Sequence, residues 1–147
     1  MPHMPGPPPV FPPIGLRLSR TAHAVSQAFE RAMAEAGGSA SSWQVLLLVR
    51  SEQWGTQSKL AEAMGVSSAT VTHHLNALET QGLVRRWRDD ANRRVQQVEL
   101  TDAGLALFDR LREVALAHDA RLRGLLTKQE VEELSRLLRK LGEGLLR

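Results

Sequence analysis

The sequence predicts a mainly α-helical fold, class α+β, with one small β-hairpin. Two observations lead to this class: a series of stretches with helical apolar periodicity, and one pair of short alternating stretches joined by turn residues. Their order along the chain is helix, helix, helix, helix, hairpin, helix, helix. The chain has 147 residues, of which 42% are hydrophobic and 24% charged, as in one globular domain.

The first 13 residues are predicted to form a Pro-rich flexible arm. All seven prolines of the chain fall within residues 2–13, and proline fixes φ and lacks the N–H that a helix interior needs. From Ile14 onward, apolar residues recur on one helical face from Leu18 to Met33, and Gly37-Gly38 end that helix. We therefore expect a single domain over residues 14–147 that begins with a helix over residues 14–37.

Three more helices are expected before the hairpin. Ser41-Ser42-Trp43-Gln44 has the Ser-x-x-Gln spacing of a capping box, and the apolar run behind it continues to about residue 52. A short helix is predicted from Gln57 to Gly65, and another from after Ser67 to Gly82.

The hairpin and two long helices follow. The strands are predicted at Leu83–Arg88 and Val95–Leu100, around the turn residues 89–92, in which Asp89 and Asp90 are expected to close the turn or orient an arginine. Thr101-Asp102 is typical of a helix start, and residues 127–130 form a second capping box. The last helix repeats leucine at alternating spacings of three and four: Leu134, Leu138, Leu141 and Leu145.

Residues 57–81 have the pattern of a helix-turn-helix motif. Ala61 is small enough for a close helix crossing, Gly65 can adopt the positive φ of a tight turn, and Val71 anchors the second helix. With Val71, Leu75 and Leu78 facing inward, a rotation of about 100° per residue turns a polar, uncharged face outward: Ala69, Thr72, His73 and Asn76. Such a face can hydrogen-bond to base edges in a major groove, although on a lone amphipathic helix it would more often be ordinary surface.

The hairpin decides between these two interpretations. It carries five arginines and directly follows the second helix of the motif at Gly82-Leu83. Arg93 and Arg94 can therefore reach the phosphate backbone or the minor groove beside the groove that the helix reads. This arrangement predicts a winged helix-turn-helix, with the hairpin as its wing.

The motif and its flanks resemble the multiple-antibiotic-resistance regulator (MarR) family. The resemblance rests on "QSKLAEAMGVSSATVTHHLNALETQGLVRR", the Asp-rich turn with paired arginines and "VELTDAG", and it covers roughly residues 14–146. It implies a homodimeric repressor of a pseudo-palindromic operator, relieved in many members by a small aromatic or carboxylate effector. Residues 14–37 and 102–147 would be the dimerisation helices and residues 41–101 the DNA-binding lobe. Asn92, where the family commonly has aspartate, and His74, at an often apolar position, depart from the pattern.

Eight residues are predicted to contact DNA. Ser67 and Ser68 would cap the recognition helix and meet phosphate. Four more residues would face the groove and two would act from the wing. They are Thr70, Thr72, His73 and Asn76 on the helix, and Arg93 and Arg94 in the wing. Trp43 and Arg50 are weaker candidates for an effector cavity, while Trp43, Trp54 and Trp87 are expected as core or interface anchors. The leucine stripes favour a dimer, with packing inside one monomer as the alternative.

Other function classes find less support in the sequence. No nucleophile elbow, phosphate-binding glycine loop or paired-carboxylate frame is recognisable, so we expect no enzyme. There are no cysteines, and His73 and His74 are adjacent and point apart, so neither a metal nor a cofactor is expected. No membrane span or export signal is readable, and cytoplasm is the expected location. A winged-helix module for protein–protein interaction, or one that binds RNA, is the alternative to a reader of double-stranded DNA.

Overall fold

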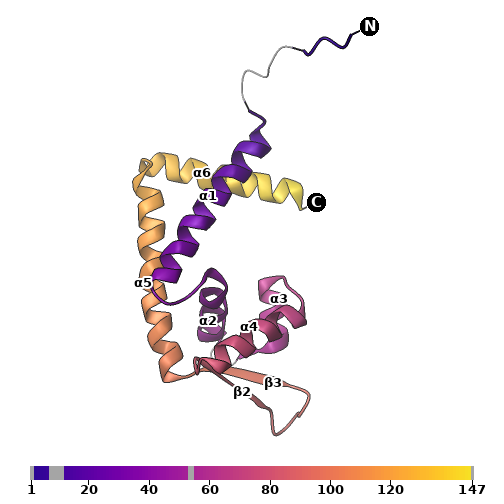
Figure 1. Ribbon diagram of the computed structural model, residues 1–147, viewed down its shortest axis with the longest axis vertical. Helices are drawn as coiled ribbons and strands as arrows, with labels where there is room; N and C mark the ends of the chain where they lie inside the picture. Colours follow the sequence, from indigo (N-terminus) through magenta and orange to yellow (C-terminus); the bar gives the residue numbers. More distant parts are fainter. Residues whose placement is uncertain (1, 7–11, 53–54, 147) are drawn as a thin grey trace.

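The computed structural model describes residues 2–6, 12–52 and 55–146. It confirms the mainly helical fold with a hairpin (Figure 1). The elements are α1 (Ile14–Glu35), α2 (Ala40–Glu52), β1 (Gly55–Thr56), α3 (Gln57–Met64), α4 (Ser68–Thr80), β2 (Val84–Arg88), β3 (Gln96–Leu100), α5 (Asp102–Gly124) and α6 (Lys128–Leu145).

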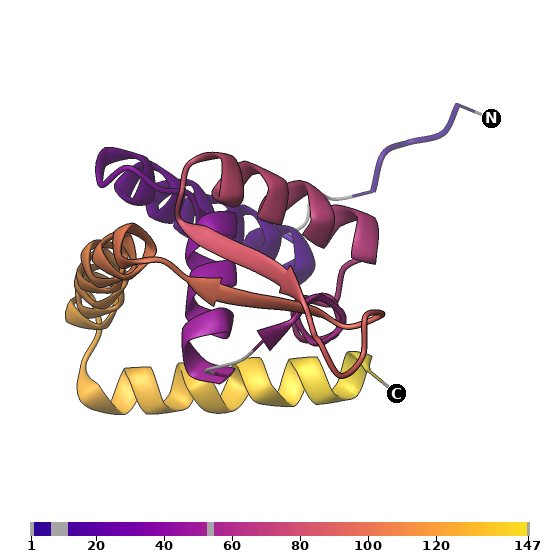
Figure 2. The same ribbon diagram turned by 90° about the horizontal axis from the view of Figure 1, so that it is seen from below.

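The molecule is elongated, with the sheet at one end. Helices α2, α3 and α4 gather with the sheet at one end, where β2 and β3 project as the wing (Figures 1 and 2). Helices α1 and α5 pack side by side and lead away from that end, and α6 crosses beyond them. No helix within the described ranges has both the length and the apolar character that crossing a membrane requires.

The sheet has three antiparallel strands in the order β1-β3-β2. In the hairpin, Val84 is opposite Leu100 and Arg88 is opposite Gln96, so each predicted strand was one residue too long at its start. Strand β1 was not predicted, because two residues are too few to show an alternating pattern. It pairs with β3 through Gly55 and Val98 and so ties the start of α3 to the wing.

One apolar core joins α2, α3, α4 and the sheet to the adjoining parts of α1 and α5. The predicted inward face of α4 is confirmed, since Val71, Leu75 and Leu78 are all buried. Met33 of α1 and Leu111 of α5 are fully buried in the same cluster. Burial of such side chains holds α4 firmly against the rest of the fold.

Helix α2 begins earlier than the sequence analysis predicted. The capping box at Ser41–Gln44 is wrong: Ser42 Oγ accepts a hydrogen bond from Ser39 N at 2.7 Å, and Ser39 Oγ accepts one from Ser42 N at 3.0 Å. Because these two serines satisfy each other's backbone groups, the helix starts at Ala40. The predicted starts at Thr101 and Thr127 are confirmed, the latter with a complete capping box.

Gly104, the glycine of the stretch VELTDAG, lets α5 approach the link between α4 and the wing closely. A Cβ on Gly104 would lie 2.0 Å from the carbonyl oxygen of Leu83. The same junction is held by Thr101, whose N donates to Leu83 O at 3.1 Å and whose Oγ1 donates to Gly82 O at 2.6 Å. The start of α5 is thereby fixed against the link between α4 and the wing.

Candidate nucleic-acid interface

The turn between α3 and α4 has the geometry of the predicted helix-turn-helix. Gly65 adopts the left-handed conformation with φ 66°, and Ala61 is buried where the two helices meet. Ser67 caps α4, since its side chain accepts a hydrogen bond from Thr70 N at 3.2 Å. The predicted capping role of Ser67 is therefore confirmed, whereas its contact with phosphate stays a prediction.

The outward face of α4 consists of small and polar side chains. Ser68, Ala69, Thr70, His73 and Asn76 are all exposed. None of these five residues is Lys, Arg, Asp or Glu, so the face is polar and lacks these charged groups. It is therefore suited to hydrogen bonding with base edges rather than to a charged protein surface.

Thr72 lies at the side of this face and is half-buried. Its Oγ1 donates to Ser68 O at 2.9 Å and accepts from Gln57 Nε2 at 2.5 Å. Because a hydroxyl has a single proton, Thr72 has no further donor to offer a ligand and retains one lone pair and its methyl group. The contact with Gln57 links α3 to α4 and was not predicted.

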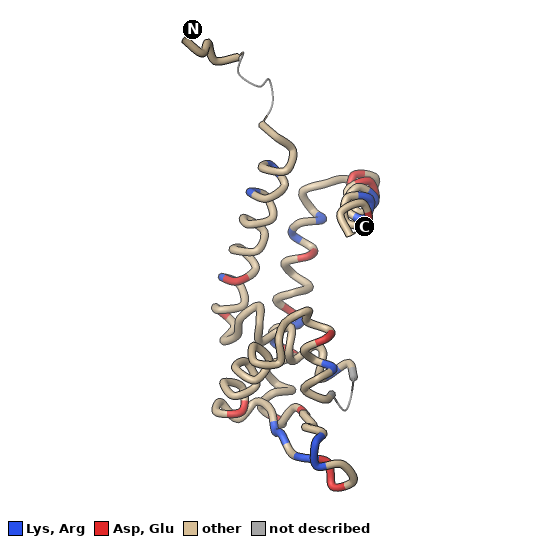
Figure 3. Tube along the Cα trace, turned by 90° about the vertical axis from the view of Figure 1, so that its right-hand side faces the viewer, with Lys and Arg blue, Asp and Glu red and all other residues tan. Residues whose placement is uncertain are grey.

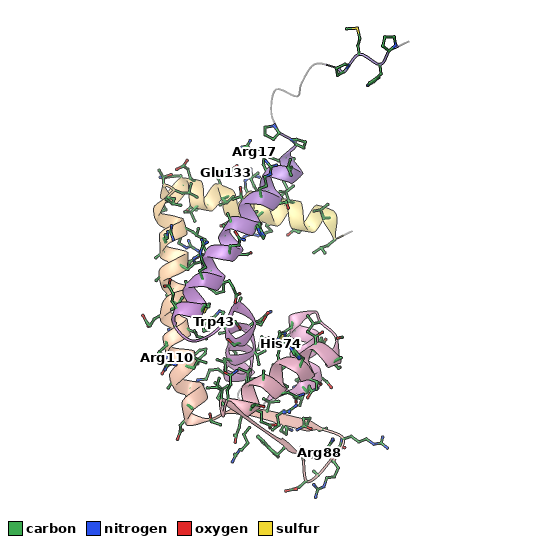
Figure 4. All side chains as sticks on the ribbon, viewed as in Figure 1. Arg17, Trp43, His74, Arg88, Arg110 and Glu133 are labelled. Carbon is green, nitrogen blue, oxygen red and sulfur yellow. The ribbon has the colours of Figure 1, made fainter. Side chains whose placement is uncertain are left out.

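Three of the five wing arginines have partners within the chain. Arg85 forms an ion pair with Glu99 and lies 5.6 Å above the ring of Trp87. Arg88 Nη1 donates to the carbonyl of Arg93 at 3.0 Å and so braces the tip of the wing. Figure 4 shows Arg88 in the wing, at the end of the molecule opposite α6.

Arg86 connects the wing to α4. Its Nη2 is 3.0 Å from Glu79 Oε1 and 2.5 Å from Asn76 Oδ1, and its side chain is only 15% exposed. The hydrogen bond from Arg86 lowers the pKa of Glu79 and keeps this carboxylate ionised. This link was not predicted, because nothing in the residue pattern shows which arginine turns back toward the helix.

Arg93 and Arg94 are exposed at the wing tip. Among the described residues, neither guanidinium has a hydrogen-bond or ion-pair partner. The backbone around them is fixed instead: Asn92 Oδ1 accepts from Arg94 N at 3.2 Å, and Asp89 Oδ1 accepts from Ala91 N at 2.8 Å. Asp89 thus closes the turn as predicted, and Asn92 supplies a neutral hydrogen bond. Figure 3 shows the positive charge concentrated in the wing.

The two residues predicted for an effector cavity lie on α2. Trp43 is half-buried and stacks on Phe108 of α5, with ring centroids 5.5 Å apart, while Arg50 is exposed. A cavity of about 230 Å³ opens nearby between the α1–α2 connection, α4 and α5, and its lining includes His74, Gln81 and Leu107 but neither Trp43 nor Arg50. Trp43 is thus an anchor between α2 and α5, as expected; Trp87 lies in β2, and Trp54 lies outside the described residues.

The adjacent histidines of α4 do not converge. The ring centroids of His73 and His74 are 5.8 Å apart and the rings are inclined by 58°. In the described part of the chain, no three His, Asp or Glu side chains come together in a group that could hold a metal ion.

Comparisons with known proteins agree with this geometry. Residues 39–95 match the model of the MarR family. A transcriptional regulator of Bacillus subtilis, YwaE, is 32% identical over 94 residues, which cover 63% of this chain and 55% of that protein. The match therefore spans little more than half of that relative's length.

Two solved structures share the fold over most of the chain. A MarR variant from E. coli, complexed with operator DNA, has a TM-score of 0.74 at 26% identity and covers 85% of this chain and 93% of its own. The transcriptional repressor CouR, bound to a 23-mer DNA duplex, has a TM-score of 0.80 at 28% identity. The match covers 88% of this chain and 92% of the CouR chain.

The fold and the motif define a winged helix-turn-helix protein of the kind found among transcriptional regulators. Together with the match of residues 39–95 to the family model and the likeness to these structures, they show that the chain is similar to proteins of the MarR family.

Proposed function

We propose that the protein is a homodimeric transcriptional repressor that binds a pseudo-palindromic site in double-stranded DNA, in the cytoplasm. One observation carries the proposal: the polar outward face of α4 lies beside a wing in which two exposed arginines, Arg93 and Arg94, have guanidinium groups without a partner among the described residues. A helix of this kind fits a major groove, and unpaired arginines next to it fit the phosphates or the adjoining minor groove.

The residues divide by role. Ser67 and Ser68 stand at the N-terminus of α4, where backbone N–H groups and the helix dipole favour phosphate. Thr70, Thr72, His73 and Asn76 would face the groove, with Thr72 limited to its methyl group and one lone pair. Arg93 and Arg94 would add sequence-independent affinity from the wing.

Exposed leucines on α6 support a dimer. Leu134, Leu138 and Leu141 are each 46–47% exposed, and among the described residues no side chain of α6 is buried. Such an apolar stripe on a helix that touches the rest of the chain only slightly needs a second surface to cover it. We propose that residues 14–37 and 102–147 form the dimer interface and that residues 41–101 form the DNA-binding lobe.

The two structures of relatives on DNA support the same function for this chain. One holds operator DNA and the other a DNA duplex, and the latter protein is a repressor. In a two-fold dimer the two copies of α4 would enter successive major grooves about 34 Å apart. A small effector would relieve repression by binding better to a dimer whose lobes are spaced wrongly for DNA.

Selection from a random pool of duplex DNA, repeated at several salt concentrations, tests the proposal. We expect enrichment of an inverted repeat with half-sites one helical turn apart, and an affinity that falls steeply with salt. If no duplex is enriched and no salt-dependent binding is measured, the protein is instead an interaction module of the same fold.

A further inference from the structure

The amide of Asn76 is oriented by Arg86 in the absence of any ligand. Arg86 Nη2 lies 2.5 Å from Asn76 Oδ1. A guanidinium carries donors and no acceptor, so the amide oxygen must be the atom that faces it. The NH₂ group of Asn76 is then the part of the amide left for a ligand, and it can only donate.

Arg86 is itself held in place. It lies in β2, where it pairs with Val98 of β3, and its guanidinium also bonds to Glu79 at 3.0 Å. Because the Arg86 side chain is only 15% exposed, the amide oxygen of Asn76 faces a guanidinium that is largely enclosed by the protein. If the Asn76 amide were flipped, it would lose the charge-assisted hydrogen bond from Arg86. Its NH₂ group would then face the guanidinium, so that donors on both sides would oppose each other.

Asn76 is also well placed to reach a ligand. It is exposed on the outward face of α4, one turn after Thr72. The proton of the Thr72 hydroxyl already goes to Ser68 O. At this side of the helix, the Asn76 amide therefore supplies the donors that a base edge can meet.

Within the DNA-binding function proposed above, on which this inference rests, we propose that Asn76 selects a base with a keto oxygen, guanine or thymine, at one position of each half-site. Guanine presents the acceptors N7 and O6 in the major groove, and thymine presents O4. Cytosine presents an amino donor there. Adenine presents one acceptor, N7, beside an amino donor that the NH₂ group of Asn76 would meet unfavourably, whereas guanine offers two acceptors side by side. The bidentate pairing of asparagine with adenine needs both amide atoms turned to the base, and Arg86 holds the oxygen.

The variant Asn76→Asp tests the inference with almost no change in shape. Aspartate keeps an oxygen for Arg86 and replaces the donating NH₂ by an accepting oxygen. Wild type and variant are selected from the same random duplex pool, and base frequencies are compared column by column. We expect one column per half-site to change from guanine or thymine to adenine or cytosine, by about 2- to 10-fold, while the other columns stay as they are.

A second variant tests the orientation of the amide while Asn76 itself is kept. Arg86→Met leaves Asn76 in place and frees its oxygen, so adenine should become accepted in the same column. Circular dichroism and thermal unfolding show whether both variants remain folded.

The outcomes distinguish this inference from the proposed function. If wild-type half-sites are enriched but the column that responds to Asn76→Asp is adenine in wild type, or if no column responds, the inference is wrong and DNA reading stands. If wild type enriches no half-site at all, the proposed function fails and the inference fails with it.

Discussion

Gly104→Ala changes one hydrogen into a methyl group at the junction of α5 with the wing. By helix propensity alone the change should stabilise the protein by up to about 1 kcal/mol, since alanine is the better helix former. The structure predicts the opposite sign. The new Cβ would lie 2.0 Å from Leu83 O, where ordinary contacts begin at 3.4 Å, and a backbone carbonyl cannot rotate away as a side chain can.

The size of the effect follows from what must move. Withdrawing α5 far enough would break the hydrogen bonds of Thr101 N to Leu83 O and of Thr101 Oγ1 to Gly82 O, which contribute about 1 kcal/mol each. Displaced packing around the buried Leu107 adds about 1–3 kcal/mol. After the gain in helix propensity, we expect a net loss of about 2–4 kcal/mol.

Urea unfolding at a fixed protomer concentration measures this difference, because the stability of a dimer depends on concentration. Gly124→Ala is the matched control, since a Cβ there meets nothing within 4 Å and the residue is also helical. It should leave the free energy of unfolding unchanged or slightly raised. A Gly104→Ala protein as stable as wild type would refute the close approach of α5 to Leu83.

Three further predictions address the interface, the dimer and the charge pair. Arg94→Ala should weaken binding to all duplexes similarly and reduce the salt slope of log affinity by about 1, measured by fluorescence anisotropy; loss of sequence preference instead would assign Arg94 to base reading. Leu138→Asp should shift the protein toward monomer, as measured by light scattering. Arg139→Asp, on the charged face of α6, is the control and should leave the dimer unchanged. A Leu138→Asp protein that remains a dimer would place the interface elsewhere. The hydrogen bond from Arg86 lowers the pKa of Glu79, so this pair stabilises the fold at neutral pH and loses the effect as pH falls through the lowered pKa. The stability gap between wild type and Glu79→Gln, below about 1 kcal/mol because the Glu79 side chain is 44% exposed, should therefore close in acid. A gap that stays constant with pH would contradict this pairing.

Local patterns in the sequence predicted most of the fold, because they report local structure. The periodicity of α4 and the caps at Ser67, Thr101 and Thr127 depend on residues a few positions apart. The start of α2 was misplaced because three nearby serines could each cap it, and the reciprocal bonds of Ser39 with Ser42 decide between them only in three dimensions.

The candidate site was predictable in its residue types and less so in its internal contacts. The pattern identified Arg93 and Arg94, but it could not show that Arg86 turns back to Glu79 and Asn76, because those partners are 7 and 10 residues away. Likewise, the hydrogen bond that Gln57 donates to Thr72 spans 15 residues and occupies an acceptor lone pair at the predicted reading face. Such contacts depend on how α4, α3 and the wing pack, which no local pattern records.

The spacing of the half-sites distinguishes a rigid dimer from two independent DNA-binding lobes. A rigid dimer would present two copies of α4 on the same face of DNA, about one helical turn apart. Affinity should be measured for the selected inverted repeat and for the same repeat with five base pairs inserted between its half-sites, which turns one half-site to the opposite face. We predict that the insertion reduces affinity to the level of nonspecific DNA. Equal affinity for the two duplexes would contradict the account, because it would mean that the recognition helices bind independently of one another.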